Sequence, residues 1–141
     1  MMGPVLRLLT GGLGVAGVLI GVAIMVAGAG AVGGTAESVF NAISGSSDVS
    51  PPWPATMDSE LRFYAALFVG FGVLCLRAAR NPAQHGKDIP WLMLVFFAGG
   101  VGRALSWISV GTPHPFFLTL MAVELVLPPI IVLLWRLASI R

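Results

Sequence analysis

Four apolar runs, each about as long as a helix that crosses a lipid bilayer, make up most of this 141-residue chain. The runs cover approximately residues 5–33, 57–79, 89–110 and 116–140, and residues 34–56 form the one substantial loop. Within a bilayer, only helices and closed barrels satisfy every backbone hydrogen bond. The sequence therefore predicts an all-α fold, an integral membrane four-helix bundle, as a single domain over residues 1–141.

The composition excludes a soluble domain and several kinds of site. Charged residues make up 10% of the chain, whereas soluble domains contain about 25%. The single cysteine, Cys75, excludes an internal disulfide or a multi-cysteine metal site, and its expected role is packing. His85 and His114 fall in loops on opposite faces of the membrane. We therefore expect no metal and no cofactor.

The basic residues predict how the chain crosses the membrane. The connections between the last three runs are short, which predicts antiparallel neighbours and an up-down-up-down bundle. Most of the basic residues then fall on one side: Arg7, Arg77, Arg80, Lys87, Arg136 and Arg141. The positive-inside rule predicts cytoplasmic termini and an extracytoplasmic loop 34–56, in a multi-pass protein of the cell inner (plasma) membrane. This distribution explains the net charge of +2 better than a nucleic-acid partner does.

Glycines follow one face of the first run. They recur at spacings of three, four and seven residues: Gly14, Gly17, Gly21 and Gly28. Gly17 and Gly21 form a GxxxG pattern, which typically lets another helix approach closely. A removable signal peptide is the alternative, because residues 27–29 resemble a cleavage site. The run is longer than the ~7–15 residues of a signal core, which favours a retained helix.

The loop after the first run has two interpretations. Ala36, Val39, Phe40 and Ile43 recur at helical spacing, which predicts a short helix on the membrane surface. The alternative is a disordered loop. Residues 51–54, Pro-Pro-Trp-Pro, are expected to be stiff and extended.

Charges inside the apolar runs mark the candidate site, because ionisable groups in hydrocarbon are costly and usually pair. Glu60, Arg62, Arg103 and Glu124 cancel in sign, so a neutral buried cluster is one arrangement. Arg103 and Glu124 both lie roughly 10–12 Å below the outer boundary, at 1.5 Å per residue. We expect these two to form an ion pair, which either locks the third helix to the fourth or contributes to a binding site.

Other residues near this pair have open interpretations. Glu60 and Tyr64 share a helix face, whereas Arg62 points away and is expected to snorkel to the interface. Asp58 in the same first turn is explained by the helix dipole. His114 is either a solvated loop residue or a group that titrates with the cluster.

Backbone features flank the pair as well. Gly99 and Gly100 admit either a neighbouring helix or a ligand next to Arg103. Pro128 and Pro129 are expected to kink the fourth helix beside Glu124, because proline lacks the N–H of a helical hydrogen bond.

Three segments of the chain resemble the motifs of a family of small bacterial membrane proteins with four helices. They are residues 58–66, residues 99–106 with 111–115, and Glu124-Leu125 with Pro128-Pro129. The family is the one catalogued as domain of unknown function 4345. The resemblance implies a retained first helix and a single domain, and it supplies no activity. The family's motif residues correspond to Glu60, Arg62, Tyr64, Arg103, Ser106 and Glu124.

Motifs of soluble enzymes are missing from the sequence: it has no Walker loop, HExxH, nucleophile elbow or CxxC. We therefore expect a non-enzymatic protein whose outer-half polar cluster binds a lipid, quinone or other small amphiphile, or organises the bundle. One alternative is an accessory or assembly subunit of a larger membrane protein complex, and another is a small homo-oligomeric transporter. The expected partners are membrane lipids, together with such a complex or a second copy bound through the Gly17/Gly21 face.

Overall fold

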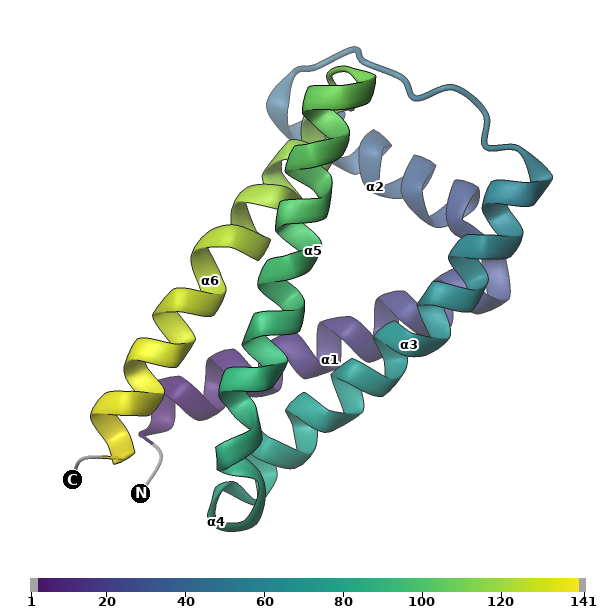
Figure 1. Cartoon of the computed structure of the whole chain (residues 1–141). Helices are drawn as coiled ribbons and strands as arrows, with labels where there is room; N and C mark the ends of the chain where they lie inside the picture. The colour runs from purple at the N-terminus through teal and green to yellow at the C-terminus, as the bar shows by residue number, and fades with distance from the viewer. Residues whose placement is uncertain (1–2, 140–141) are drawn as a thin grey trace.

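The computed structural model describes residues 3–139, and these form an all-helical fold (Figure 1). The elements are α1 (Pro4–Ala27), α2 (Ala29–Ser44), α3 (Ala55–Arg80), α4 (Pro82–His85), the 3-10 turn η1 (Gly86–Asp88), α5 (Ile89–Val110) and α6 (Pro115–Ser139). Four segments are long and apolar enough to cross a membrane: Pro4–Ala27, Ala55–Arg80, Pro82–Val110 and Pro115–Ala138. The predicted all-α fold with four spans is confirmed, and the protein is a multi-pass membrane protein. Residue 140, the predicted end of the last span, and Arg141 lie outside the described residues.

The four spans form two antiparallel pairs, α1 with α3 and α5 with α6 (Figure 1). The pairs meet at the end of the molecule that holds both chain ends and α4, which we call the termini end. They diverge toward the opposite end, the loop end, which carries the α2–α3 loop and the α5–α6 turn. α2 crosses between the pairs at the loop end. The predicted up-down-up-down order is present, but the bundle is closely packed only toward its termini end.

The buried hydrophobic cluster lies at the termini end, where all four spans contribute to it. Its residues are Leu6, Cys75, Ala78, Ile89, Leu92, Met93 and Ile131. Cys75 is fully buried, in agreement with the predicted packing role. This cluster holds the two helix pairs together at the termini end.

α1 and α3 approach each other most closely along the glycine face of α1. A Cβ at Gly17 would lie 3.2 Å from the Cα of Gly72, and a Cβ at Gly21 would lie 2.9 Å from the carbonyl oxygen of Ala65. The predicted close approach is confirmed, and its partner is α3 of the same chain. The Gly17/Gly21 face is therefore covered by α3 in this fold, and self-association through it stays a prediction.

The first helix ends earlier than the sequence predicts. α1 stops at Ala27, not at residue 33, because Gly28 adopts φ 88°, a backbone conformation that residues with a Cβ rarely adopt. A new helix, α2, begins at Ala29 and runs in a different direction (Figure 1). The apolar run thus folds into one membrane span and the start of a bridging helix.

α2 resolves the two interpretations of the following segment. Residues 36–43 lie inside this helix, so the helical interpretation is right and the disordered one is wrong. α2 ends at Ser44, and the next residue, Gly45, has a φ of 73°, the left-handed conformation that closes many helices. Only residues 45–54 remain as loop. The carboxylate of Glu37 fastens this loop, because it accepts hydrogen bonds from the Ser50 hydroxyl at 2.6 Å and the Ser50 N–H at 3.3 Å.

Candidate functional site

An ion pair between Arg103 and Glu124 joins α5 to α6 in the half of the molecule nearer the loop end. Arg103 Nε donates to Glu124 Oε2 at 2.8 Å. The Glu124 side chain is 12% exposed and the Arg103 side chain 40% exposed. Gly100 allows this approach, since a Cβ there would lie 2.9 Å from the Cβ of Glu124. The predicted pairing is confirmed, and Gly100 serves helix packing. α6 continues as a helix through Pro128 and Pro129, and the kink there stays a prediction.

Two aromatic rings extend the ion pair toward α2. The guanidinium carbon of Arg103 lies 5.9 Å from the centroid of the Phe117 ring, a cation–π distance. The Phe117 ring lies 6.4 Å from the ring of Trp53, between centroids. Trp53 packs on α2, where a Cβ at Gly33 would lie 3.7 Å from the indole. We call Arg103, Glu124, Phe117 and Trp53 the Arg103 cluster.

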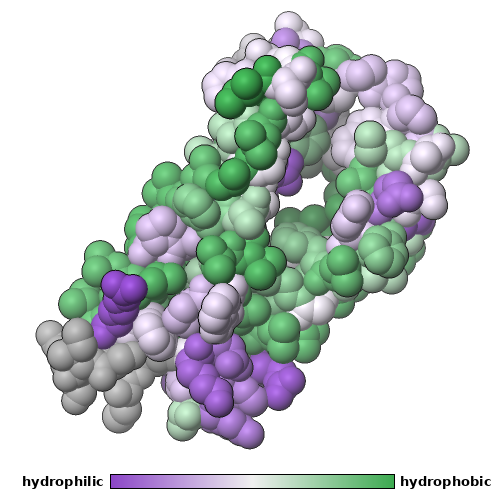
Figure 2. Space-filling view, viewed as in Figure 1, coloured by the Kyte–Doolittle hydropathy of each residue, from purple (hydrophilic) through white to green (hydrophobic). Residues whose placement is uncertain are grey.

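An opening lies between the two helix pairs, and α5, which carries Arg103, borders it (Figure 1). Figure 2 shows this opening in the space-filling view, bordered by α5, α2, α3 and α1 in the arrangement of Figure 1. Arg103 belongs to α5 and Trp53 packs on α2, two of the helices that border the opening. Toward the termini end, Phe71 of α3 and Phe96 of α5 stack with centroids 5.7 Å apart and bridge the two pairs.

The ion pair leaves hydrogen-bonding groups unused. Within residues 3–139, Arg103 donates through Nε alone, so both terminal amino groups keep their protons available. Glu124 accepts through Oε2, and its Oε1 accepts no hydrogen bond from the described residues. The cluster therefore combines free donors, a free acceptor and aromatic surface, while its two formal charges cancel.

Arg62 forms a different ion pair, with Asp58. Arg62 Nε donates to Asp58 Oδ2 at 2.7 Å, and Arg62 Nη1 donates to the carbonyl oxygen of Met25 at 2.7 Å. Asp58 Oδ1 accepts the backbone N–H of Ala29 at 3.1 Å. The unpaired carbonyls at the end of α1 and the nearby carboxylate hold the Arg62 guanidinium, and its snorkelling to the interface stays a prediction. Asp58 therefore stabilises the turn at Gly28 between α1 and α2, in addition to its favourable interaction with the dipole of α3.

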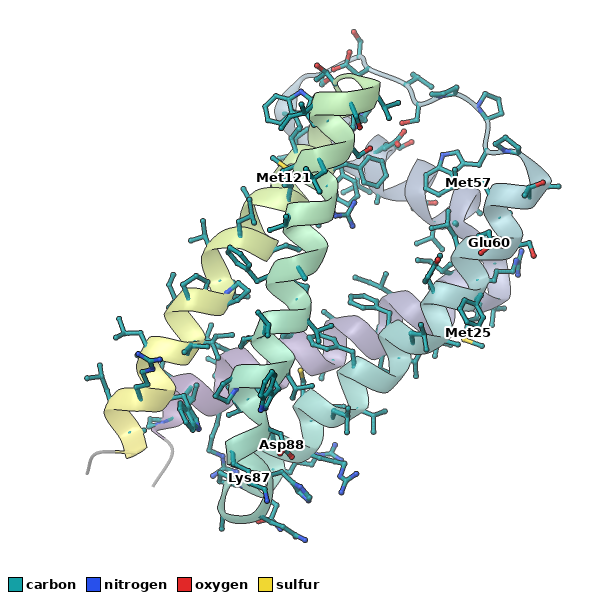
Figure 3. All side chains as sticks on the ribbon, viewed as in Figure 1. Met25, Met57, Glu60, Lys87, Asp88 and Met121 are labelled. Atoms are coloured by element: carbon teal, nitrogen blue, oxygen red, sulfur yellow. The ribbon has the colours of Figure 1, made fainter. Side chains whose placement is uncertain are left out.

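Glu60, Tyr64 and Ser106 are not brought to the ion pair. In the part of the chain that the structure describes, no hydrogen bond or ion pair links their side chains to Arg103 or Glu124. All three are exposed, Tyr64 by 57%. Figure 3 labels Glu60 on the loop-end part of α3, across the opening from α5. The neutral cluster of four charges is therefore wrong, because the two arginines belong to separate pairs.

His114 is buried, at 8% exposure, so the interpretation as a solvated loop residue is wrong. Its Nδ1 accepts the backbone N–H of Phe116 at 3.1 Å, which leaves the proton of the neutral ring on Nε2. Nε2 lies 3.1 Å from the carbonyl oxygen of Asp48, which also accepts a bond from Asn41 at 2.7 Å. Phe40 packs edge-on against the imidazole. His114 therefore ties the loop to the start of α6.

Three residues of these sites were missing from the predicted set: Asp58, Trp53 and Phe117. The first had a usable signal, since Asp58 and Arg62 stand at the i,i+4 spacing of a helical ion pair. Trp53 and Phe117 come into contact because α2 packs over α6. No local sequence pattern predicts that packing.

Comparisons with known proteins give one match. The model of the family described as Domain of unknown function (DUF4345) matches residues 5–135. No curated protein and no solved structure matches the chain. Among the described residues, no three His, Cys, Asp or Glu side chains are grouped to hold a metal ion.

Proposed function

The chain belongs to the DUF4345 family, and on that premise we propose that it is a non-enzymatic membrane protein that binds a small amphiphile at the Arg103 cluster. The family description assigns no activity, so the proposal depends on the geometry of the site. The observation that carries it is the half-exposed Arg103 guanidinium, which uses one of its nitrogens for Glu124 and belongs to α5, one of the helices that border the opening (Figure 1).

The ion pair uses only Nε of Arg103 and Oε2 of Glu124, and their other hydrogen-bonding atoms are not required to hold the two helices together. Polar groups at membrane depth are costly unless something satisfies them. The terminal amino groups of Arg103 and Oε1 of Glu124 are satisfied when a ligand or water fills the opening. Sites of this kind, apolar with a few convergent polar groups, are common between the helices of bundles.

The chemistry of the cluster favours an uncharged, planar headgroup. Glu124 cancels the charge of Arg103, so the site offers little net attraction to an anion. The rings of Phe117 and Trp53 present surfaces on which a flat ring can stack. A quinone ring has carbonyl oxygens for the Arg103 donors and a hydrocarbon tail that stays in the bilayer. We therefore place quinones first among the lipid-like ligands.

The test is native mass spectrometry of the protein extracted gently from its own membrane, followed by titration of the purified protein with a short-chain quinone. The main variant combines Arg103→Met with Glu124→Gln, which removes both charges together and so avoids leaving either one unpaired. The matched control is Glu60→Gln, the same chemical change on an exposed residue without a partner in the described chain.

We expect the parent and Glu60→Gln to retain a small molecule, and the double variant to fold but lose it. A bare parent that also fails to bind the quinone would contradict the proposal. A larger protein in fixed stoichiometry would instead favour the alternative of an accessory or assembly subunit. An assembly of several copies would favour the transporter alternative.

The orientation in the membrane is a further part of the proposal: both termini are cytoplasmic, in the cell inner (plasma) membrane. Basic residues at the termini end support it. Arg7 Nε donates to the carbonyl oxygen of Ala79 at 3.0 Å, which brings Arg7 beside Arg80, and Arg77 lies 3.4 Å from His85. Figure 2 shows the hydrophilic surface around α4 at this end. The positive-inside rule assigns such an end to the cytoplasm.

A further inference from the structure

A groove of about 460 Å³ lies between α1 and α3 at the termini end, outside the Arg103 cluster. Its walls are mostly apolar and include Leu8, Val15 and Leu76. Gly11 forms part of its floor, since a Cβ there would meet nothing closer than the Cβ of Ala79 at 3.5 Å. The groove runs from the start of α1 to Val15, so it continues from the helix ends into the depth of the membrane-spanning segment.

Two arginines stand at the shallow end of this groove. Arg7 lines it and uses Nε for the carbonyl oxygen of Ala79 at 3.0 Å, so its terminal amino groups keep their protons available. Arg80 lines it as well, and within residues 3–139 its side chain makes no hydrogen bond or ion pair. None of the residues that line the groove is acidic. The net charge at this end is therefore positive, in contrast to the Arg103 cluster.

From this arrangement we infer that the groove binds an anionic phospholipid. Its phosphate lies against Arg7 and Arg80, and one acyl chain lies along Leu8, Gly11 and Val15. Arginine suits this role because its planar guanidinium donates two parallel hydrogen bonds to a phosphate. The distance from Arg7 to Val15 is about 12 Å along the helix, enough for a substantial part of an acyl chain.

The shape of the groove favours a lipid over a soluble anion. A free phosphate would contact only the two arginines and leave the apolar length of the groove unfilled. A phospholipid fills both parts, because the two arginines line the groove together with apolar residues that continue along the spans α1 and α3. The inference is independent of the ligand proposed for the Arg103 cluster, since the two sites lie at opposite ends of the spans.

The test is a native mass spectrometry titration of the delipidated protein with phosphatidylglycerol and with phosphatidylcholine of identical acyl chains. Arg80→Gln removes one charge from the groove, and Arg136→Gln removes one from the same end of the molecule outside it. Gly11→Leu fills the apolar part without changing any charge. Gly12→Leu is its control, because Gly12 is exposed and a Cβ there meets nothing within 4 Å.

We expect phosphatidylglycerol to bind more tightly than phosphatidylcholine. Arg80→Gln should weaken phosphatidylglycerol binding about fivefold, the usual effect of one basic residue at a lipid headgroup, and Arg136→Gln should leave it unchanged. Gly11→Leu should also weaken binding, and Gly12→Leu should not.

Equal losses in Arg80→Gln and Arg136→Gln would overturn the inference, because they would indicate attraction to the whole basic end. Unchanged binding in Gly11→Leu would overturn it as well. Displacement of the lipid by inorganic phosphate alone would identify a site for a free anion, which is also incompatible with the inference. Each variant is compared with the parent by gel filtration and thermal melting, so that loss of folding is recognised separately.

Discussion

Gly14 and Gly72 face each other where the backbones of α1 and α3 are closest. A Cβ at Gly14 would lie 2.8 Å from the carbonyl oxygen of Gly72, and a Cβ at Gly72 would lie 2.7 Å from that of Gly14. This contact fixes the spacing of the first helix pair. Without large side chains between them, the two backbones gain dispersion contacts along their length, which is how small residues stabilise helix pairs in membranes.

The first prediction follows from this contact. Gly72→Ala should destabilise the protein by about 1–3 kcal/mol, the usual cost of overpacking, because the neighbouring atoms are backbone and cannot move aside. Gly70→Ala is the matched control on the same helix, since a Cβ there meets nothing within 4 Å. It should be neutral or stabilise by up to about 1 kcal/mol. Thermal melting in detergent measures both, and equal effects would contradict the close-contact explanation.

The second prediction concerns the ion pair. Glu124→Gln should destabilise the protein by about 1–3 kcal/mol. This value lies between the cost of breaking an exposed ion pair and the cost of breaking a buried ion pair, because the Arg103 side chain is 40% exposed. Adding Arg103→Met should restore most of the loss, since no charge is then left unpaired. Glu60→Gln should leave the melting temperature unchanged. An unchanged melting temperature in Glu124→Gln alone would show that the pair contributes nothing to stability.

The third prediction concerns the break between α1 and α2. Asp58→Ala removes the acceptor for the Ala29 N–H and the partner of Arg62, and it should destabilise the protein by about 1 kcal/mol. Hydrogen exchange at the start of α2 should become faster. Asp58→Asn retains an oxygen acceptor and should show a smaller increase, and Ser59→Ala on the exposed neighbour should show none. Equal exchange in all three variants would mean that Asp58 does not hold the break.

The fourth prediction tests the orientation. In a Cys75→Ala background, a cysteine is introduced either at Ser47 in the loop or at Gln84 in α4, two exposed positions at opposite ends of the molecule. A membrane-impermeant maleimide applied to intact cells should label Ser47→Cys. It should label Gln84→Cys only after the membrane is permeabilised. The reverse pattern would place the termini outside the cytoplasm.

The sequence by itself determined the properties that depend on local composition. The length and apolarity of the four runs predicted four spans, because burying a backbone in hydrocarbon requires helices of that length. Equal depth in adjacent antiparallel runs was enough to predict that Arg103 pairs with Glu124. The glycine spacing predicted a close helix contact in the same way.

The tertiary structure decided which groups meet across separate elements. The turn at Gly28 ends α1 beside α3, so the Arg62 guanidinium also donates to the carbonyl oxygen of Met25, a contact between two elements. The same turn carries α2 over to α6 and brings Trp53 against Phe117. These contacts depend on the rotation and direction of whole helices. A pattern within one helix specifies its own face, whereas the partner of that face is set only when the helices pack together.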